Sequence, residues 1–225
     1  GQTTTASIIL SPATTITSSP LGAGFVSVDG SPITTPQTFT WNSNHSHIIT
    51  ANSLVSGSTG IRYLWTNWSD SGTVTHTITA TNLPATYTAN FQTQFFLTIT
   101  IVGPGAVSQS SGWYDAGSQV TITATPYSGY KTVWIGSGTG AYSGLENQTT
   151  LTINNPISET ITFALDPNVP QNGVVHSASY VQPPLAPGSI ISIFGTNLCN
   201  AIAYASALPL PTTLSGTTVL INGTS

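Results

Sequence analysis

Residues 111–140, SGWYDAGSQVTITATPYSGYKTVWIGSGTG, hold the pattern that decides the fold. Two aromatic residues lead into a turn at 115–117, and the run QVTITA (119–124) then alternates polar and apolar residues. Alternation of this kind, rich in β-branched residues, predicts a strand that buries one of its faces. Trp134 follows, shortly before a glycine-rich loop. The stretch fits two descriptions: an aromatic binding site, or one unit of a repeating scaffold.

Strand patterns recur along the chain. TVTHTITA (73–80) and TTLTI (149–153) also alternate, and FFLTITIV (95–102) is apolar enough for a more deeply buried strand. Glycine, proline, asparagine and serine bound these runs, as they do at turns. Sustained helical periodicity with caps is missing from the sequence. The predicted fold class is therefore all-β.

The chain is unusually poor in charge. It has 225 residues, with two Lys and Arg and six Asp and Glu, 4% in all, where soluble domains carry about 25%. Its polarity comes from 39 threonines and 28 serines. Binding to nucleic acid or to an anionic membrane needs clustered basic residues, so both are excluded. No run approaches the roughly 18 apolar residues of a membrane span. A neutral hydroxyl surface favours self-association or a sugar coat.

Three short matches in the same order show an internal repeat. The matching pairs are GAGFVS (22–27) with GPGAVS (103–108), WSDSG (68–72) with WIGSG (134–138), and YTANF (87–91) with TITFA (160–164). The distance in sequence between the two members of a pair changes from one pair to the next, because the loops of the two copies differ in length. We therefore expect two small β-repeat modules in tandem. The expected division is a leader at 1–19, module one at 20–94, module two at 95–166, a Pro/Asn/Gly linker at 167–173 and a third unit at 174–225.

The second module resembles the internalin-type β-repeats that stand in tandem on bacterial surface proteins. The resemblance rests on the run W-Y-x-A-G-x-x-V-T-I-T-A-T-P-x-x-G-Y-x-x-x-W (113–134) and on the strand T-I-T-F (160–163). The first module resembles the same family but departs from its pattern, because TPQTFTW (35–41) replaces the A-G-S-Q-V-T-I-T-A portion. The resemblance implies spacers, stalks and adhesin segments.

The third unit resembles a different domain. Its segment V-x-x-A-S-Y…P-L-A-P-G-S-I-I-S-I-F-G-T-N-L (175–198) is similar to the opening of an immunoglobulin-like domain in secreted proteins of soil bacteria, acidobacteria among them. The resemblance implies a partial immunoglobulin-like β-sandwich at the end of the chain.

The aromatic residues of the second module have two interpretations. As scaffold, Trp68 and Trp134 fill equivalent cores, because large aromatic side chains supply much of the burial that a small β-module needs. As a binding site, exposed rings would stack on sugars, and the candidates are Trp113, Tyr114, Tyr127, Tyr130 and Tyr142. The recurrence of tryptophan at equivalent places favours the scaffold.

No catalytic constellation is visible in the sequence. A hydrolase needs a nucleophile, a base and an orienting acid, and the chain has no G-x-S-x-G elbow. His45 and His47 share one face of a strand, with His76 as a candidate to lie across from them, but the sequence shows no definite third ligand. We expect these histidines to face solvent. We expect no enzyme activity, no cofactor and no metal.

Four sequons and one cysteine are candidate modification sites. In a host with the machinery, N-glycosylation would fall on Asn44, Asn67, Asn147 and Asn222. Cys199 has no second cysteine in the chain, so it is either a small buried hydrophobe or a thiol for an intermolecular bridge.

The sequence favours a secreted, non-enzymatic structural protein, a self-associating subunit of a bacterial surface filament or stalk. The third unit shows too few strands for a closed sandwich of about seven, so a strand from another subunit could complete it. The candidate donor strand is Ile8, Ile9 and Leu10. The alternative is a third unit that is simply cut short. The rival hypothesis for function is an adhesin or carbohydrate-binding module that holds a surface polysaccharide through exposed aromatics.

Overall fold

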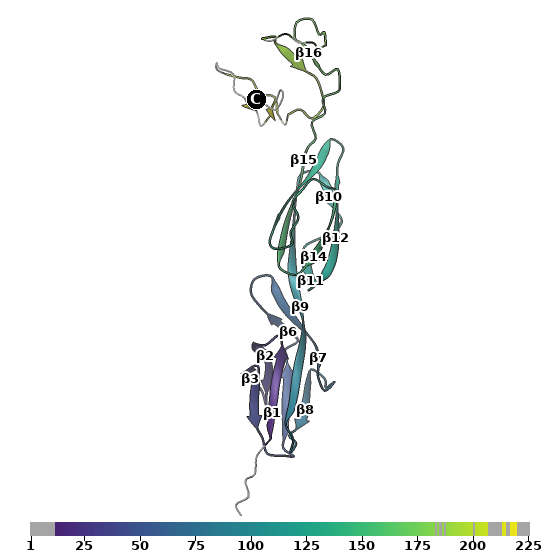
Figure 1. Ribbon diagram of the computed structural model, residues 1–225. Coiled ribbons are helices and arrows are strands. Elements are labelled where there is room, and N and C mark those ends of the chain that lie inside the picture. Colours follow the sequence, from purple (N-terminus) through teal and green to yellow (C-terminus); the bar gives the residue numbers. More distant parts are fainter. Residues whose placement is uncertain are drawn as a thin grey trace, which may run out of the picture.

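The computed structural model describes residues 12–182, 184, 186, 188–199, 201–206, 213–214 and 217–219. Its described elements are all strands, so the all-β prediction is confirmed. Across these residues no helix is present that is long and apolar enough to cross a membrane. Figure 1 shows the chain drawn out along one axis, with two β-units end to end and the third part beyond them.

The first unit, residues 13–94, is a sandwich of two β-layers around one core. Side chains that alternate along the strands point into it, and Ile16, Ile49 and Trp68 have no exposed surface. One layer contains β4 (Gln37–Thr40), β1 (Ala13–Ser19), β9 (Ala85–Val102), β7 (Ile61–Trp68) and β6 (Leu54–Ser56). The facing layer contains β3 (Ser31–Thr34), β2 (Ala23–Val28), β5 (Ser46–Ala51) and β8 (Thr75–Thr79).

The second unit, residues 95–165, repeats this plan. One layer contains β11 (Gly112–Asp115), the second half of β9, β15 (Ile157–Leu165) and β13 (Tyr130–Ser137). The facing layer contains β10 (Gly105–Val107), β12 (Ser118–Pro126) and β14 (Gln148–Ile153). On β12 the predicted alternation holds, because Val120, Ile122 and Ala124 are buried between more exposed polar residues. This burial of one strand face is what ties the unit together.

One long strand belongs to both units. β9 has 18 residues and contains neither glycine nor proline, so no residue type interrupts it. Its first half pairs in parallel with β1 and antiparallel with β7. Its second half pairs in parallel with β15 and antiparallel with β11. A single eight-stranded sheet therefore runs through both units, and β9 is the strand that joins them in Figure 1.

The two units carry equivalent tryptophans. Trp68 on β7 and Trp134 on β13 are both buried, in positions that pair with β9 and β15 respectively. Each indole N–H donates to a backbone carbonyl of the following loop, at 3.2 Å from Val74 and 2.7 Å from Glu146. A buried indole needs such an acceptor. The scaffold interpretation of the two tryptophans is confirmed.

The first unit begins earlier than the sequence predicted. Residues 13–19 were expected in the leader, but they form β1, which lies in register with residues 85–90 of β9. Ile16 on β1 belongs to the core. The run ATTITSS alternates as a strand should, yet its partner lies far along the chain, so only the tertiary pairing reveals its place. The candidate donor residues Ile8, Ile9 and Leu10 lie outside the described residues.

Beyond β15 the described chain forms short ladders. β16 (Val174–His176) pairs with β17 (Ile191–Ile193), and β18 (Thr213–Leu214) pairs with β19 (Thr217–Thr218). The expected linker at 167–173 is held in place, because Asn168 bridges to Thr196. Asn197 Nδ2 also donates to the carbonyl of Gly129 on the second unit, at 3.1 Å. The immunoglobulin-like interpretation of 174–225 stays a prediction.

Candidate functional site

Two large aromatic side chains lie outside both cores, on the outer face of the shared sheet. Trp113 on β11 pairs directly with Phe96 on β9, and the two rings meet edge to face with centroids 5.1 Å apart. Successive side chains of a strand point to opposite faces. Because Leu97 points into the second core, its neighbour Phe96 must take the outer face. The register of β9 therefore places an apolar pair at the junction of the units.

Neutral polar side chains cover the outer face along β9 on either side of this pair. Parallel pairing of β1 and β15 with β9 aligns them in rows across the strands. The members are Thr15, Thr17, Thr86, Thr88, Asn90, Gln92, Thr98, Thr100, Ser158, Thr160 and Thr162. The face thus offers hydroxyl and amide groups for hydrogen bonds without adding charge.

A chain of side-chain hydrogen bonds crosses the junction beside the aromatic pair. Arg62 Nε on β7 donates to Gln94 Oε1 at 2.7 Å, and Gln94 Nε2 donates to Asp115 Oδ1 on β11 at 2.7 Å. The guanidinium carbon of Arg62 also lies 4.5 Å from the centre of the Trp113 ring, in a cation–π contact. The first unit, the shared strand and the second unit are therefore linked by side chains as well as by backbone.

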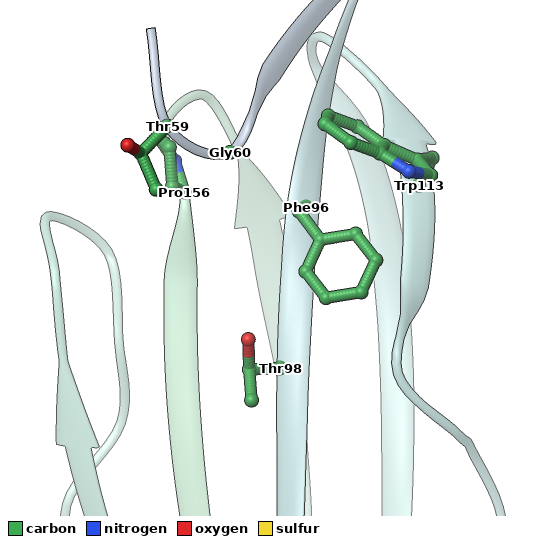
Figure 2. A pocket seen from close by; sticks show the side chains of 6 residues that line it. All are labelled: Thr59, Gly60, Phe96, Thr98, Trp113 and Pro156. Atoms are coloured by element: carbon green, nitrogen blue, oxygen red, sulfur yellow. The ribbon is translucent and has the colours of Figure 1, made fainter.

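A groove of about 320 Å³ opens at the same place. Its lining residues are Thr59, Gly60, Phe96, Thr98, Trp113 and Pro156. In Figure 2 the two aromatic rings stand on one side, Pro156 and the turn at Gly60 stand on the other, and Thr98 lies further along β9. The groove is lined by these apolar walls and by two threonines.

The turn at Gly60 sets one wall of the groove by a close backbone approach. Gly60 has a φ of +77°, and a Cβ placed there would lie 2.8 Å from the Cβ of Pro156. Its carbonyl accepts a hydrogen bond from the Phe96 N–H at 2.9 Å. Glycine alone combines this backbone conformation with the missing Cβ. The first unit therefore contacts the residue just before β15 directly.

Of the five predicted sugar-stacking residues, only Trp113 lines this groove. Tyr114, Tyr130 and Tyr142 are half-buried against the core of the second unit. Tyr127 is 59% exposed, in the turn after β12. The five rings therefore do not form one platform, because their strands turn them toward different faces.

Sequence reasoning missed Phe96, Arg62 and Asp115 as members of the site. The face of the sheet that each side chain takes depends on the register between β9 and its partner strands. A shift of one residue in that register would move the side chain to the opposite face. A usable signal was present in the chemistry: Arg62 is one of only two basic residues in the chain, and Phe96 breaks a run of polar residues at alternate positions of β9.

The predicted modification sites stand apart from the groove residues. Asn44, with a φ of +64°, and Asn67 are exposed on the first unit. Asn147 is exposed on the second, where its Oδ1 accepts a hydrogen bond from Thr132 Oγ1 at 2.6 Å. Asn222 lies outside the described residues. Cys199 is exposed, so its interpretation as a buried hydrophobe is wrong.

The sequence predicted histidines that face solvent, but two of them pair with aspartates. His47 Nδ1 lies 2.8 Å from Asp29 Oδ2, and His76 Nε2 lies 2.9 Å from Asp70 Oδ2. The hydrogen bond with His47, together with a second from a backbone N–H, lowers the pKa of Asp29. Within the described ranges no three histidine, cysteine or acidic side chains gather as a metal site would require.

Glu159 on β15 is a buried carboxyl in the core of the second unit. Burial raises its pKa, and the hydrogen bond that Oε1 accepts from the Tyr142 N–H at 2.7 Å acts in the opposite direction. Its second oxygen has no hydrogen-bond partner among the described residues. The side chain holds the loop around Tyr142 against the sheet and lies on the inner face, away from the groove.

Comparison with known families gives one match. Residues 96–167 match the divergent InlB B-repeat domain. The matched stretch is the second unit and less than half of the chain, and it confirms the resemblance predicted for that unit. No curated protein matches the chain.

Comparison with solved structures finds domains 3–4 of a streptococcal cell surface protein, of the type named Streptococcal High Identity Repeats in Tandem. They align with 69% of this chain and 99% of their own, at 12% identity and a TM-score of 0.21. A likeness at this TM-score carries no weight for fold or function.

Proposed function

We propose that the chain is a non-enzymatic structural segment of a bacterial surface protein and acts as a stiff spacer in an extracellular stalk. The B-repeat match of the second unit supports a surface location, since such repeats stand in tandem on bacterial surface proteins. The scarcity of charge supports a packing or spacing role over binding of nucleic acid. The elongated arrangement in Figure 1 supports a spacer.

The observation that carries the proposal is the shared strand. At the junction, Gln94 pairs with Arg62 on one edge and with Asp115 on the other, and Phe95 is paired on both edges in the same way. A bend there would break ladder hydrogen bonds on both sides of β9. Two domains joined by a free linker would move independently, whereas these two have no linker between them. The units should therefore behave as one stiff body.

The test is to interrupt β9 at the junction by inserting two glycines after Gln94. Two residues preserve which face each later side chain takes, so both cores can still form. We expect the unaltered protein to unfold in one cooperative transition and to have a narrow length distribution in small-angle X-ray scattering. The insertion should split the transition in two and broaden the distribution.

The matched control is the same insertion after Gln171, beyond the second unit. It adds the same flexibility without touching β9, so the transition of the two units should stay single. Two independent transitions in the unaltered protein, or no effect of the junction insertion on stiffness, would count against the spacer.

A further inference from the structure

We propose that the groove at the junction of the two units is a binding site for a neutral polysaccharide. One sugar ring would rest against the apolar walls formed by Phe96, Trp113 and Pro156, and neighbouring sugars would lie along the hydroxyl rows beside β9. This activity goes beyond the spacer role and does not depend on it. The site exists because both units contribute to it, the first through the turn at Gly60 and the second through Trp113 on β11 and through Pro156.

The position of the aromatic pair is the first support. Neither Phe96 nor Trp113 belongs to a hydrophobic core, and both line an open groove (Figure 2). Junction packing alone does not require an apolar hollow, because the approach of Gly60 to Pro156 already closes the contact between the units. A sugar ring has an apolar C–H face and a polar rim, and this groove has apolar walls with Thr59 and Thr98 at its edge. The two surfaces are complementary.

Unused hydrogen-bonding atoms beside the groove are the second support. Among the described residues, Arg62 is engaged through Nε alone and Asp115 through Oδ1 alone. The terminal amino groups of Arg62 and Oδ2 of Asp115 are therefore left to meet ligand hydroxyls. Arg62 is also fixed over the Trp113 ring, so little side-chain freedom is lost on binding.

Charge decides the class of polysaccharide. Arg62 and Asp115 balance each other through Gln94, and the flanking rows are hydroxyls and amides. The other basic residue of the chain, Lys131, is paired with Asp166 at 3.8 Å. A polyanion would find no second cation at the groove, so the ligand is neutral. A proline-rich peptide could use the same apolar walls, but it would leave the hydroxyl rows without partners.

The experiment titrates the full chain with neutral oligosaccharides and follows binding by tryptophan fluorescence and calorimetry. The probes are cellohexaose, maltohexaose, chitohexaose and mannohexaose, with oligogalacturonate as the anionic probe and a polyproline peptide as the competitor. We expect at least one neutral probe to bind with an affinity that does not change between low and high salt. We expect Trp113→Ala to weaken that binding by about thirtyfold, as for the loss of a central aromatic anchor.

Two further variants separate binding from folding. Thr98→Tyr fills the groove without removing an aromatic contact, so it should abolish binding even if Trp113→Ala proves unstable. Tyr127→Ala removes an exposed ring outside the groove and should leave the affinity unchanged. Saturation by none of the neutral probes, tighter binding of the anionic probe or the peptide, or full affinity in Thr98→Tyr would overturn the proposal. None of these results bears on the stiffness of the β9 junction.

Discussion

Glu159 shows how a single position can differ between two copies of one scaffold. It pairs with Ile99 and lies two residues before the partner of Trp134, whereas Tyr87 holds the same place in the first unit, two residues before the partner of Trp68. The second unit thus has a buried carboxyl, with one oxygen that has no hydrogen-bond partner among the described residues, where the first unit has an aromatic side chain. A buried charge without a partner reduces stability. The second unit should therefore be less stable than the same unit would be without this buried carboxyl.

At pH values above the folded-state pKa of the Glu159 carboxyl, Glu159→Gln should stabilise the protein by on the order of 1 kcal/mol, because the amide keeps an acceptor for the Tyr142 N–H and carries no charge. The raised pKa of Glu159 means that the folded state binds its proton more tightly than the unfolded state. Stability of the unaltered protein therefore falls as pH rises through the folded-state pKa. The gain in the variant should shrink toward zero as pH falls below the ordinary glutamate range.

The measurement is urea unfolding at a series of pH values, with Glu146→Gln as the control. Glu146 is exposed and contributes only its backbone carbonyl to Trp134, so its substitution should leave the pH profile unchanged. An equal gain in Glu159→Gln at acidic and alkaline pH would show that ionisation is not the cause.

The turn at Gly60 allows backbone strain and steric contact to be separated. Gly60 and Gly117 have similar positive φ values, +77° and +82°, but among the described residues an added Cβ would meet a neighbour at Gly60 and none at Gly117. Gly117→Ala should cost about 1 kcal/mol from the left-handed backbone alone. Gly60→Ala should cost more than that, because it also pushes the turn away from Pro156.

Chemical denaturation of both alanine variants checks this expectation, and scattering checks the junction. Gly60→Ala should also loosen the two units relative to one another, whereas Gly117→Ala should not. Equal destabilisation by the two substitutions would mean that the contact with Pro156 contributes nothing.

At the scale of strands, the sequence predicted the elements that show a local alternation of polar and apolar residues. The strands at 119–124 and 149–153 and the equivalence of Trp68 with Trp134 follow from periodicity and repeat spacing, and the structure has them. The continuity of β9 was missed because the repeat boundary was placed at 94/95, inside a run without a turn residue. Matching of repeats locates the point where each similar stretch begins. A strand that belongs to both copies continues through that point, so its sequence contains no boundary between them.

The groove could not be predicted for a related reason. Which side chains of β9 and β11 face outward is fixed by pairing between strands that are distant in sequence, and the approach of Gly60 to Pro156 depends on the whole junction. Trp113 was named from its chemistry alone. Phe96 interrupts the polar residues at alternate positions of β9, but this signal alone does not tell which face of the sheet the ring takes.

At the scale of the whole molecule, assembly by strand donation remains a hypothesis with a direct test. We expect electron microscopy of the purified chain to show fibres, and deletion of residues 1–11 to remove them. Because β1 begins at Ala13, the deletion should leave the melting temperature of the two units unchanged. Ile8→Ser with Leu10→Ser is the matched variant, since it keeps the length but removes the apolar donor residues.

A dispersed monomer of 23.3 kDa before deletion, or fibres that survive the deletion, would refute strand donation through this segment. A melting temperature that falls with the deletion would mean that residues before β1 support the first unit, and fibre loss would then need the serine variant for its interpretation.

The shared strand also constrains how such a chain can change length over generations. Because β9 closes one sandwich and opens the next, the stretch that a gene can copy or lose cleanly runs from the middle of β9 to the equivalent point of β15. Recombination at those points leaves every ladder in register and every core complete. A crossover between points that are not equivalent in the two copies would join half-strands with mismatched partners. Arrays of this kind should therefore gain or lose whole units, each running from one junction to the next. The loops outside the shared sheet can vary freely.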